Sequence, residues 1–438
     1  MNAAPIRPLL PQFARLAATL ATMLATGCAL AIGSDARAQF HRIDPLGGSS
    51  SSVLAISNHY GAAVVGGWGG TADGAAHGVW YLNQALVDVG TIGGANSVVV
   101  GISESGTYLA GWGSVHPTDF SLTHAVRWLR YGPALDLGTL GGCCSMAYDI
   151  NSSGTVVVGS STPASGANRA FRWVEGSGMS SLGTLGGWSR AHGVDGSGSS
   201  VVGTSDLADG TGSHRAFRWT QGSGMTSLGT LGGSSSSAEA ISANGQFIVG
   251  YSDDGEGYQR PFLWHAKSGM TALPMPPGYS GYASSVGYAT YGWQGSGPFI
   301  AVGGRVHDPS GQQRAAIWRE DLGMIDLTAL LQARGTLPAG WTVLREVTAI
   351  SRDGRSIGGY GVFNGQMRGF MIEGLTFAGI GCEGDVDLDS EVSARDITVI
   401  LSNWGPNPVE ARADINGDNR VDGIDLSIVL GNWGDCTG

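Results

Sequence analysis

Short apolar runs, separated by glycine, serine and aspartate, dominate the chain between residues 40 and 375. Alternation of apolar and polar positions within these runs is typical of β-strands, and long runs with helical spacing are absent there. In one stretch four strand-like pieces follow one another, and they are Ala191–Val194, Ser200–Gly203, Arg215–Trp219 and Met225–Leu231. In the third piece the alternation places Phe217 and Trp219 on one face and Arg218 on the other, so we expect the aromatic pair to pack against the next unit.

Such groups of four strands recur about every 46 residues. One landmark is Leu-Gly-Thr-Leu-Gly-Gly, which occurs at 137–142, 182–187 and 228–233 and in weaker form at 89–94. A second landmark is an aromatic residue that ends an apolar run, and its copies are Trp80, Trp128, Trp173, Trp219, Trp264, Trp318 and Phe370. Four strands at this period are typical of propeller blades, so the pattern predicts a mainly β fold, a seven-bladed β-propeller of ~46-residue repeats. A β-sandwich array and a β-solenoid remain as alternatives.

The two ends of this region predict how the ring closes. Residues 40–48 resemble a fourth strand and its turn with no strand before them, whereas the last unit has no clear fourth strand after Phe370. A closed ring leaves no sheet edge exposed. We therefore expect the N-terminal strand to complete the last blade.

The C-terminal part of the chain contains a duplication, in which the segment from Asp385 corresponds to the segment from Asp414. Each copy has oxygen-bearing side chains at positions 1, 3, 5, 9 and 12 of a twelve-residue loop and a backbone carbonyl (Glu391 or Arg420) at position 7. The first set is Asp385, Asp387, Asp389, Ser393 and Asp396, and the second set is Asp414, Asn416, Asp418, Asp422 and Asp425. An EF-hand-type loop surrounds Ca²⁺, a hard cation with about six to eight oxygen ligands, in this way. The pattern predicts a small α-helical domain that binds two Ca²⁺ ions; the alternative is two acidic, solvated turns.

The N-terminal segment 1–38 has the composition of a secretory signal peptide. Arg7 and Arg15 give a basic start, residues 16–32 are apolar, and Ala36-Arg-Ala38 precedes a cleavage point at Gln39. We therefore expect a signal peptide at 1–38, the propeller at 39–376, the calcium-binding domain at 377–438, and an extracellular or cell-surface location. A membrane anchor and a lipoprotein are weaker alternatives, and no later segment is apolar enough to span a bilayer.

Charge and cysteines single out the same C-terminal segment. Of a formal net charge of −11, residues 382–438 contribute twelve acidic residues against three arginines. There is no basic stripe, which argues against a nucleic-acid partner. Cys382 and Cys436 bracket the duplication, and in an oxidising compartment a disulfide between them would staple a domain with little core of its own. For the adjacent Cys143 and Cys144, two buried thiols are favoured over a vicinal disulfide.

The propeller region resembles the HAF family of extracellular repeats over roughly residues 40–375. The run for which that family is named appears as His124-Ala-Val126, Arg169-Ala-Phe171 and His214-Arg-Ala-Phe217. This resemblance labels the repeat but implies no chemistry.

The C-terminal segment resembles a type I dockerin bounded by Gly381-Cys382 and Gly434-Asp-Cys436. The resemblance implies two Ca²⁺-binding loop–helix repeats, with the ligands given above, that dock onto a cohesin on another protein or on the cell surface. Loop position 6, which favours glycine, is Ser390 or Asn419 here. Positions 10 and 11, often Ser-Thr in cohesin-binding dockerins, are Ala394-Arg395 and Gly423-Ile424. The resemblance therefore supports calcium binding more strongly than it supports binding to a standard cohesin. We expect a cohesin-like or cell-envelope protein as partner.

For the propeller we expect a binding or scaffold role, with no catalytic residues, in a monomeric protein. The alternative is a dockerin-bearing carbohydrate-active enzyme, which would need two carboxylates that face each other across a sugar. The acidic residues fall mostly in turns, where aspartate is common for local hydrogen bonding, and they are Asp44, Asp73, Asp149, Asp195, Glu239 and Asp353. The histidines lack metal-ligand spacing. The aromatic-rich sixth unit (Tyr279, Tyr282, Tyr288, Tyr291 and Trp293) is where a glycan or protein ligand of the propeller would bind, although a longer packed loop is the favoured interpretation of this segment.

Overall fold

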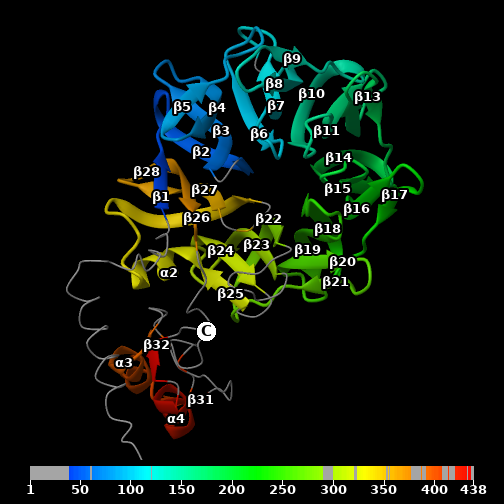
Figure 1. The fold of residues 1–438 in the computed structure, drawn as a ribbon. Coiled ribbons are helices and arrows are strands. Elements are labelled where there is room, and N and C mark those ends of the chain that lie inside the picture. The colour runs from blue at the N-terminus through cyan, green and yellow to red at the C-terminus, as the bar shows by residue number, and fades with distance from the viewer. Residues whose placement is uncertain are drawn as a thin grey trace, which may run out of the picture. The chain divides into compact units, whose positions relative to one another are not determined.

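The computed structural model describes residues 39–59, 62–119, 121–289, 299–319, 323–351, 354, 356–375, 386, 391–406, 413, 420–431 and 433–435. Seven four-stranded antiparallel sheets surround a common centre (Figure 1). The fold of this region is therefore a seven-bladed β-propeller, which confirms the prediction from the repeat. The first strand of blades 1 to 6 lies nearest the centre and the fourth lies at the periphery (Figure 1).

Blades 1 to 6 are each built from four consecutive strands. They are β2–β5 (Gly47–His59, Ala62–Thr71, Ala76–Leu82, Ala85–Asp88), β6–β9 (Ser97–Ile102, Tyr108–Ser114, Thr123–Leu129, Ala134–Asp136), β10–β13 (Gly141–Ile150, Val156–Pro163, Arg169–Val174, Gly178–Ser181), β14–β17 (Gly186–Val194, Ser200–Leu207, His214–Thr220, Gly224–Ser227), β18–β21 (Gly232–Ile241, Phe247–Asp254, Gln259–His265, Gly269–Ala272) and β22–β25 (Ser280–Ala289, Phe299–His307, Gln313–Arg319, Gly323–Asp326). Helix α2 (Leu327–Ala333) follows blade 6.

Blade 7 combines the two ends of the propeller region. Its strands β26 (Trp341–Ile350), β27 (Ser356–Phe363) and β28 (Gln366–Glu373) are followed in the sheet by β1 (Gln39–Ile43). Strand β1 runs antiparallel to β28, with Gln39 opposite Glu373 and Ile43 opposite Gly369. The N-terminal strand therefore closes the ring, as the sequence predicts.

The Leu-Gly-Thr-Leu-Gly-Gly motif carries the chain from one blade to the next. We expected the segment up to Leu231 to be a strand, but β17 already ends at Ser227. Gly229 and Gly232 adopt φ values of +83° and +108°, and such a backbone breaks the strand. The backbone N–H of Leu231 instead donates to Ser252 Oγ in blade 5 at 2.9 Å. The motif is thus a crossover turn rather than a strand.

A buried serine joins neighbouring blades at five positions. Ser189 is typical, since its Oγ accepts the N–H of Ala170 in blade 3 at 2.9 Å and donates to Gly183 O at 2.6 Å. The serines that make this pair of bonds are Ser51, Ser97, Ser145, Ser189 and Ser236, all at most 2% exposed. Each one gives a partner to a buried backbone N–H of the preceding blade, which would be costly to leave unpaired, and also bonds a carbonyl in the segment that leads into its own blade.

The aromatic pair of the third strand lies on one face, as expected, but it packs in the other direction. Phe217 lies in one core cluster with Val158 and Ala170 of blade 3, which is the preceding blade, and Trp219 packs against that cluster. Phe171 and Trp173 likewise pack on blade 2. Alternation along a strand assigns side chains to a face, but it does not say which neighbour that face meets.

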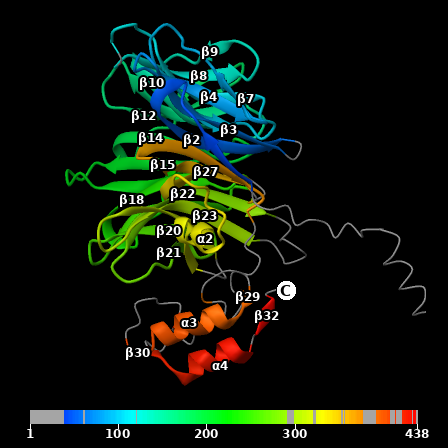
Figure 2. The ribbon, with the colours of Figure 1, turned by 90° about the vertical axis from the view of Figure 1, so that its left-hand side faces the viewer.

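The C-terminal segment contains two helices of equal length, α3 (Ala394–Ser402) and α4 (Gly423–Gly431), which lie side by side (Figure 2). Two short sheets connect the repeats crosswise: β29 (Glu391–Val392) pairs with β32 (Gly434–Asp435), and β30 (Gly405–Pro406) pairs with β31 (Arg420–Val421). The apolar core between them contains Val386, Val392, Ile400, Ala413, Val421 and Val429.

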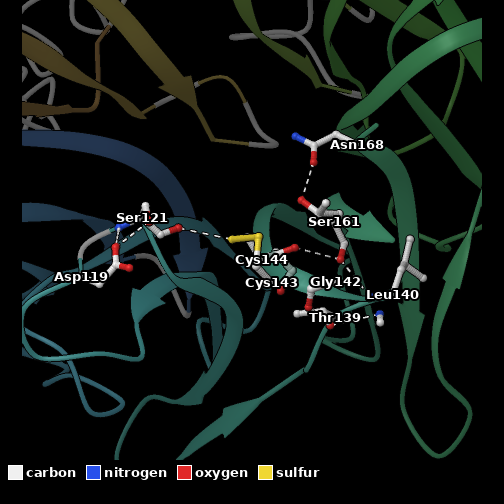
Figure 3. The surroundings of a disulfide bond; sticks show 12 residues. Asp119, Ser121, Thr139, Leu140, Gly142, Cys143, Cys144, Ser161 and Asn168 are labelled. Carbon is white, nitrogen blue, oxygen red and sulfur yellow. Dashed lines mark hydrogen bonds between the residues drawn. A yellow bond between two sulfur atoms is a disulfide. The ribbon is translucent and has the colours of Figure 1, made fainter. Parts of the chain in front are cut away.

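Cys143 and Cys144 form a disulfide at the start of β10 (Figure 3). Cys143 is exposed and Cys144 is half-buried, with its Sγ 3.3 Å from Ser121 O. The expectation of two buried thiols is therefore wrong. The pairing register between β10 and β11 shifts between Gly141 and Ser145, so strand alternation does not turn either cysteine into the core. Within the described part of the chain, no helix is long and apolar enough to cross a membrane.

Candidate functional site

The two loop–helix repeats begin their helices in the same way. At α3, Ser393 Oγ accepts the N–H of Arg395 at 3.2 Å. At α4, Asp422 Oδ1 accepts the N–H of Ile424 at 2.8 Å. These residues occupy loop position 9 and act as N-caps, because their side-chain oxygens satisfy a donor that the first turn of a helix leaves open.

The residue at loop position 12 is a fully buried carboxylate in both repeats. Asp396 and Asp425 are 0% exposed. Asp396 Oδ2 accepts the N–H of Ser393 at 2.8 Å, and Asp425 Oδ2 accepts the N–H of Asp422 at 2.9 Å. Asp396 Oδ1 also accepts the N–H of Val386 at 2.6 Å, which ties the loop to the helix. Both carboxylates are therefore fixed where each helix begins, close to its positive dipole end.

This donor set fits a hard cation. All described side chains at ligand positions offer oxygen, which Ca²⁺ prefers, and two of them are buried carboxylates that a bound cation would stabilise. At position 7, Glu391 and Arg420 both lie in short strands, β29 and β31, whose pairing holds the backbone there. When bound, Ca²⁺ would neutralise the loop carboxylates.

The remaining predicted ligands lie outside the described residues, and they are Asp385, Asp387, Asp389, Asp414, Asn416 and Asp418. Cys382 and Cys436, the predicted disulfide pair, also lie outside them. Among the residues that are described, no group of three or more histidine, cysteine or acidic side chains could hold a metal. The structure thus places positions 7, 9 and 12 of both loops and leaves positions 1, 3 and 5 as predictions.

Large apolar side chains are exposed at equivalent positions of the two repeats. Leu401 is 56% exposed and Leu430 is 54%, whereas Trp404 and Trp433 are 50% and 54% exposed. Loop positions 10 and 11 (Ala394-Arg395 and Gly423-Ile424) are exposed as well. The duplication therefore repeats an apolar surface in addition to a ligand set.

The aromatic residues of the sixth unit do not form an open ligand platform where they are described. Tyr279 packs against the core of blade 6. Tyr282 donates from its hydroxyl to Glu346 Oε1 at 3.0 Å and stacks under Arg305, whose Cζ lies 4.2 Å from the ring centroid. Nothing is described of the Tyr288 side chain, and Tyr291 and Trp293 lie outside the described residues. For Tyr279 and Tyr282 the packed interpretation is the right one.

A buried carboxylate that sequence reasoning missed lies between blades 6 and 7. Glu346 is 5% exposed, and its Oε2 accepts the Tyr360 hydroxyl at 3.0 Å and lies 3.3 Å from Arg305 Nη1. Burial raises the pKa of Glu346, opposed by Arg305 and the tyrosine hydroxyls. Burial and the charge of Glu346 raise the pKa of Tyr282 and Tyr360. Because these residues come from β22, β23, β26 and β27, no spacing in the sequence brings them together.

The other acidic residues make contacts within their own turn or strand end, or with a neighbouring blade. Asp73 and Asp195 accept bonds within their own turns, from Ala75 and Ser199 among others. Asp44 pairs with Arg42, and Glu239 lies 3.3 Å from His192 Nδ1. Asp353 lies outside the described residues.

Asp149 differs from these residues, because burial raises its pKa to about 7. Its carboxylate oxygens accept the N–H of Val194 in blade 4 at 2.9 Å and of Ile150 at 2.7 Å. This carboxyl group therefore links blade 3 to blade 4.

Residues 383–431 match the model of the dockerin type I domain. The match covers both helices and both predicted loops, and dockerin type I domains generally bind calcium. It confirms the resemblance of the C-terminal segment. No curated protein shows significant sequence similarity to the chain.

Several solved structures share the propeller fold. An oligogalacturonate lyase from Vibrio parahaemolyticus matches with a TM-score of 0.45 and 11% identity, over 77% of this chain and 96% of that chain. TolB from Acinetobacter baumannii matches with a TM-score of 0.40 and 13% identity, over 73% of this chain and 66% of TolB. A puromycin hydrolase matches with a TM-score of 0.44 and 12% identity, over 72% of this chain and 50% of that chain. These likenesses concern the fold alone.

The expectation of a propeller without catalysis needs correction. The similar propellers include a lyase and a hydrolase. The expectation that the protein is not an enzyme is therefore wrong as a conclusion drawn from a propeller fold. Residue patterns in the repeats describe how the blades pack, and the fold by itself does not decide whether a propeller carries an active site.

Proposed function

We propose that the protein is exported, binds two Ca²⁺ ions in its C-terminal dockerin-like segment and is attached through that segment to a cohesin-like or cell-envelope protein. In this proposal residues 1–38 are the signal peptide, residues 39–376 are the propeller, and residues 377–438 are the docking domain. The propeller, with its HAF-like repeats, is the body that this domain holds in place and that presents a surface to a glycan or protein ligand.

The observation that carries the calcium proposal is the equal geometry of the two repeats. The N-cap at position 9 and the buried carboxylate at position 12 recur, joined by a hydrogen bond of 2.8 Å in the first repeat and 2.9 Å in the second. Two solvated acidic turns would not require a buried carboxylate at the same position of both repeats. The five aspartates and one asparagine at positions 1, 3 and 5 of the sequence pattern supply the remaining side-chain oxygens of two cages.

The exposed apolar residues support a partner at this segment. Leu401, Trp404, Leu430 and Trp433 are each at least half exposed. Burial of such side chains at an interface stabilises a complex by roughly 1.5–3 kcal/mol for each leucine. Aromatic residues are also enriched where protein partners bind. Because the apolar positions recur with the duplication, both helices offer related contacts to a partner.

The proposal is tested with the whole chain expressed by its producing cell. We expect it to co-fractionate with the cell envelope in millimolar Ca²⁺ and to be released by a chelator. The double variant Leu401→Ser with Leu430→Ser should be released even in calcium, while calorimetry still detects calcium binding. Its matched control is Ser402→Ala, a neighbouring exposed position of α3, which should remain attached.

Two results would contradict separate parts of the proposal. A chain that remains in the medium with and without calcium would exclude the attachment role. Titration of the purified chain that shows no uptake of Ca²⁺ at millimolar concentration would exclude the calcium sites themselves.

A further inference from the structure

The arginine that precedes the tryptophan of the third strand has equivalents in blades 2, 3 and 4. These are Arg127, Arg172 and Arg218. Arg127 and Arg172 both donate to a carbonyl of the following blade, at Gly154 and Gly198 respectively. The two blade interfaces can therefore be compared residue by residue.

Between blades 2 and 3 the charge of this arginine is compensated. Arg127 is 8% exposed, and its Nη2 donates to Glu175 Oε1 at 2.8 Å. Its guanidinium also lies between two rings, with Cζ 4.6 Å from the centroid of Tyr108 and 4.9 Å from that of Trp173. The hydrogen bond and charge of Arg127 lower the pKa of Glu175. At this interface the two rings pack against the guanidinium of Arg127, and the carboxylate of Glu175 compensates its charge.

Between blades 3 and 4 two of these partners have changed. The position of Glu175 is occupied by Gln221, and that of Tyr108 by the smaller Val156. Arg172 Nε still donates to the next blade, at Gly198 O, 3.0 Å away. Within the described residues Arg172 has no ion pair at 4 Å or less. A neutral amide and a smaller side chain thus replace the carboxylate and the ring.

Asp195, the acid whose charge acts on Arg172, is already engaged. Asp195 Oδ1 accepts Ser197 Oγ at 2.9 Å and the N–H of Ser199 at 2.8 Å, and its Oδ2 accepts Ser199 Oγ at 3.1 Å. Burial lowers the pKa of Arg172, and the charge of Asp195 opposes this effect. An arginine stays protonated at neutral pH in spite of such a decrease.

A pocket of about 460 Å³ lies beside Arg172. Its lining contains two arginines, an aromatic ring and several hydroxyl groups, contributed by Arg172, Ser197, Ser199, Ser200, Arg218 and Trp219, with Gln221 beside them. Arg218 Nη2 donates to Ser200 Oγ at 3.0 Å. Its buried Nε has no hydrogen-bond partner among the described atoms. The volume lies in the range of small-molecule sites, which usually combine an apolar wall with a few polar groups.

We propose that this pocket binds a small molecule through an oxyanion group, which is a carboxylate, a sulfate or a phosphate. The anion would take the role that the carboxylate of Glu175 has at the neighbouring interface. Arginine suits this role because its planar guanidinium donates two parallel hydrogen bonds to such a group. The serine hydroxyls are further donors, and the ring of Trp219 offers apolar surface to the rest of the ligand. This site is independent of the proposed role of the C-terminal segment.

The test is a calorimetric titration of the full-length protein with sulfate, phosphate and glucuronate. Ionic strength is held constant with sodium chloride, and glucose is the uncharged control. We expect at least one oxyanion to bind and glucose not to bind. Glucuronate as the only binder would identify an organic acid as the source of the oxyanion, whereas sulfate or phosphate alone would identify an inorganic one.

The decisive variant is Gln221→Glu, which gives Arg172 the carboxylate that Arg127 already has. We expect it to weaken binding at least tenfold and to leave the melting temperature equal or higher, so that lost binding is not lost folding. The matched control is Glu175→Gln at the neighbouring interface, which should leave the affinity unchanged. Arg172→Gln should weaken binding by a similar factor.

Two outcomes would overturn the proposal. One is that sulfate, phosphate and glucuronate all fail to bind at millimolar concentration. The other is that Gln221→Glu binds an oxyanion as tightly as the unaltered protein, because the pocket would then not be the site.

Discussion

The two kinds of repeat in this chain have diverged to very different degrees. In the C-terminal segment the equivalent leucines are almost equally exposed, 56% for Leu401 against 54% for Leu430. In the propeller the equivalent arginines differ in their chemistry, because Arg127 forms an ion pair with Glu175, whereas Arg172 forms none with any acidic residue that the structure describes. The segment repeats its framework together with its exposed leucine and tryptophan positions, which suits a single task performed twice. The propeller repeats only its framework, and each blade interface is free to acquire its own chemistry.

The largest expected effect comes from opening the ring. Deletion of residues 39–44 removes β1, with the buried Ile43 and the ladder to β28. Loss of one buried side chain and several strand hydrogen bonds costs roughly 5 kcal/mol, which lowers the melting temperature by about 10 °C or more. Differential scanning calorimetry measures it. Deletion of residues 377–438, which removes no strand of the seven blades, is the control, and equal melting temperatures for the two deletions would contradict ring closure as a source of stability.

Calcium is expected to act on the C-terminal segment alone. Asp396→Ala and Asp425→Ala should each abolish one of two binding events in a calorimetric titration of the full chain, because each removes the fixed carboxylate of one loop. Asp209→Ala is the control, since that carboxylate accepts the N–H of Thr211 in an exposed turn of the propeller. A variant that retains two events would show that position 12 is not a ligand.

A smaller effect is expected at the bridging serines of the propeller. Ser189→Ala leaves the buried N–H of Ala170 without its partner and removes the bond to the carbonyl of Gly183. The free energy of unfolding should fall by about 1–3 kcal/mol. Urea unfolding measures this loss, and Ser180→Ala, at an exposed position of β13, should change stability by less than about 0.5 kcal/mol. Equal losses in the two variants would argue against a special role for the bridge.

The last prediction concerns the pH dependence of stability and the carboxyl group that links blades 3 and 4. The pKa of Asp149 is raised from 3.8 to about 7. Between these values the folded protein keeps a proton that the unfolded chain releases, so the stability that this group contributes is full below pH 3.8 and is lost as pH rises through about 7. Because Asp149 keeps part of its surface exposed, the slope should stay below the limit of about 1.4 kcal/mol per pH unit. Urea unfolding from pH 4 to 8 should show a shallower slope for Asp149→Asn, and identical slopes would contradict the assignment.

The sequence predicts those features that depend on spacing. Seven aromatic landmarks and a lone N-terminal strand were sufficient for the blade number and for the pairing of β1 with β28. The duplication of the C-terminal segment was sufficient for the two helices and for the equivalent positions of Asp396 and Asp425. In each case a local pattern is repeated, and repetition makes a short signal recognisable.

Contacts between neighbouring blades were not predictable from the sequence in the same way. The direction of the aromatic packing was predicted wrongly, because alternation does not identify the neighbouring blade. The contact of Glu346 with Tyr282 and Arg305 joins three strands and leaves no pattern in the chain. The bridging serines, in contrast, had a signal that could have been used, since Ser189 and Ser236 both stand shortly after the glycine pair of the crossover motif.

The position of β1 also determines the order in which the molecule can be completed. Residues 39–43 leave the ribosome before every other strand of the propeller, but their partner residues 369–373 are made more than three hundred residues later. Until then the cluster around Ile43, Val53 and Tyr81 lacks Met371, which covers it in the finished ring. Closure is therefore a late event with a long loop to close, and topologies of this kind fold slowly. A chain that terminates before Gly369 has to retain this open apolar face, which makes truncated products targets for aggregation or proteolysis.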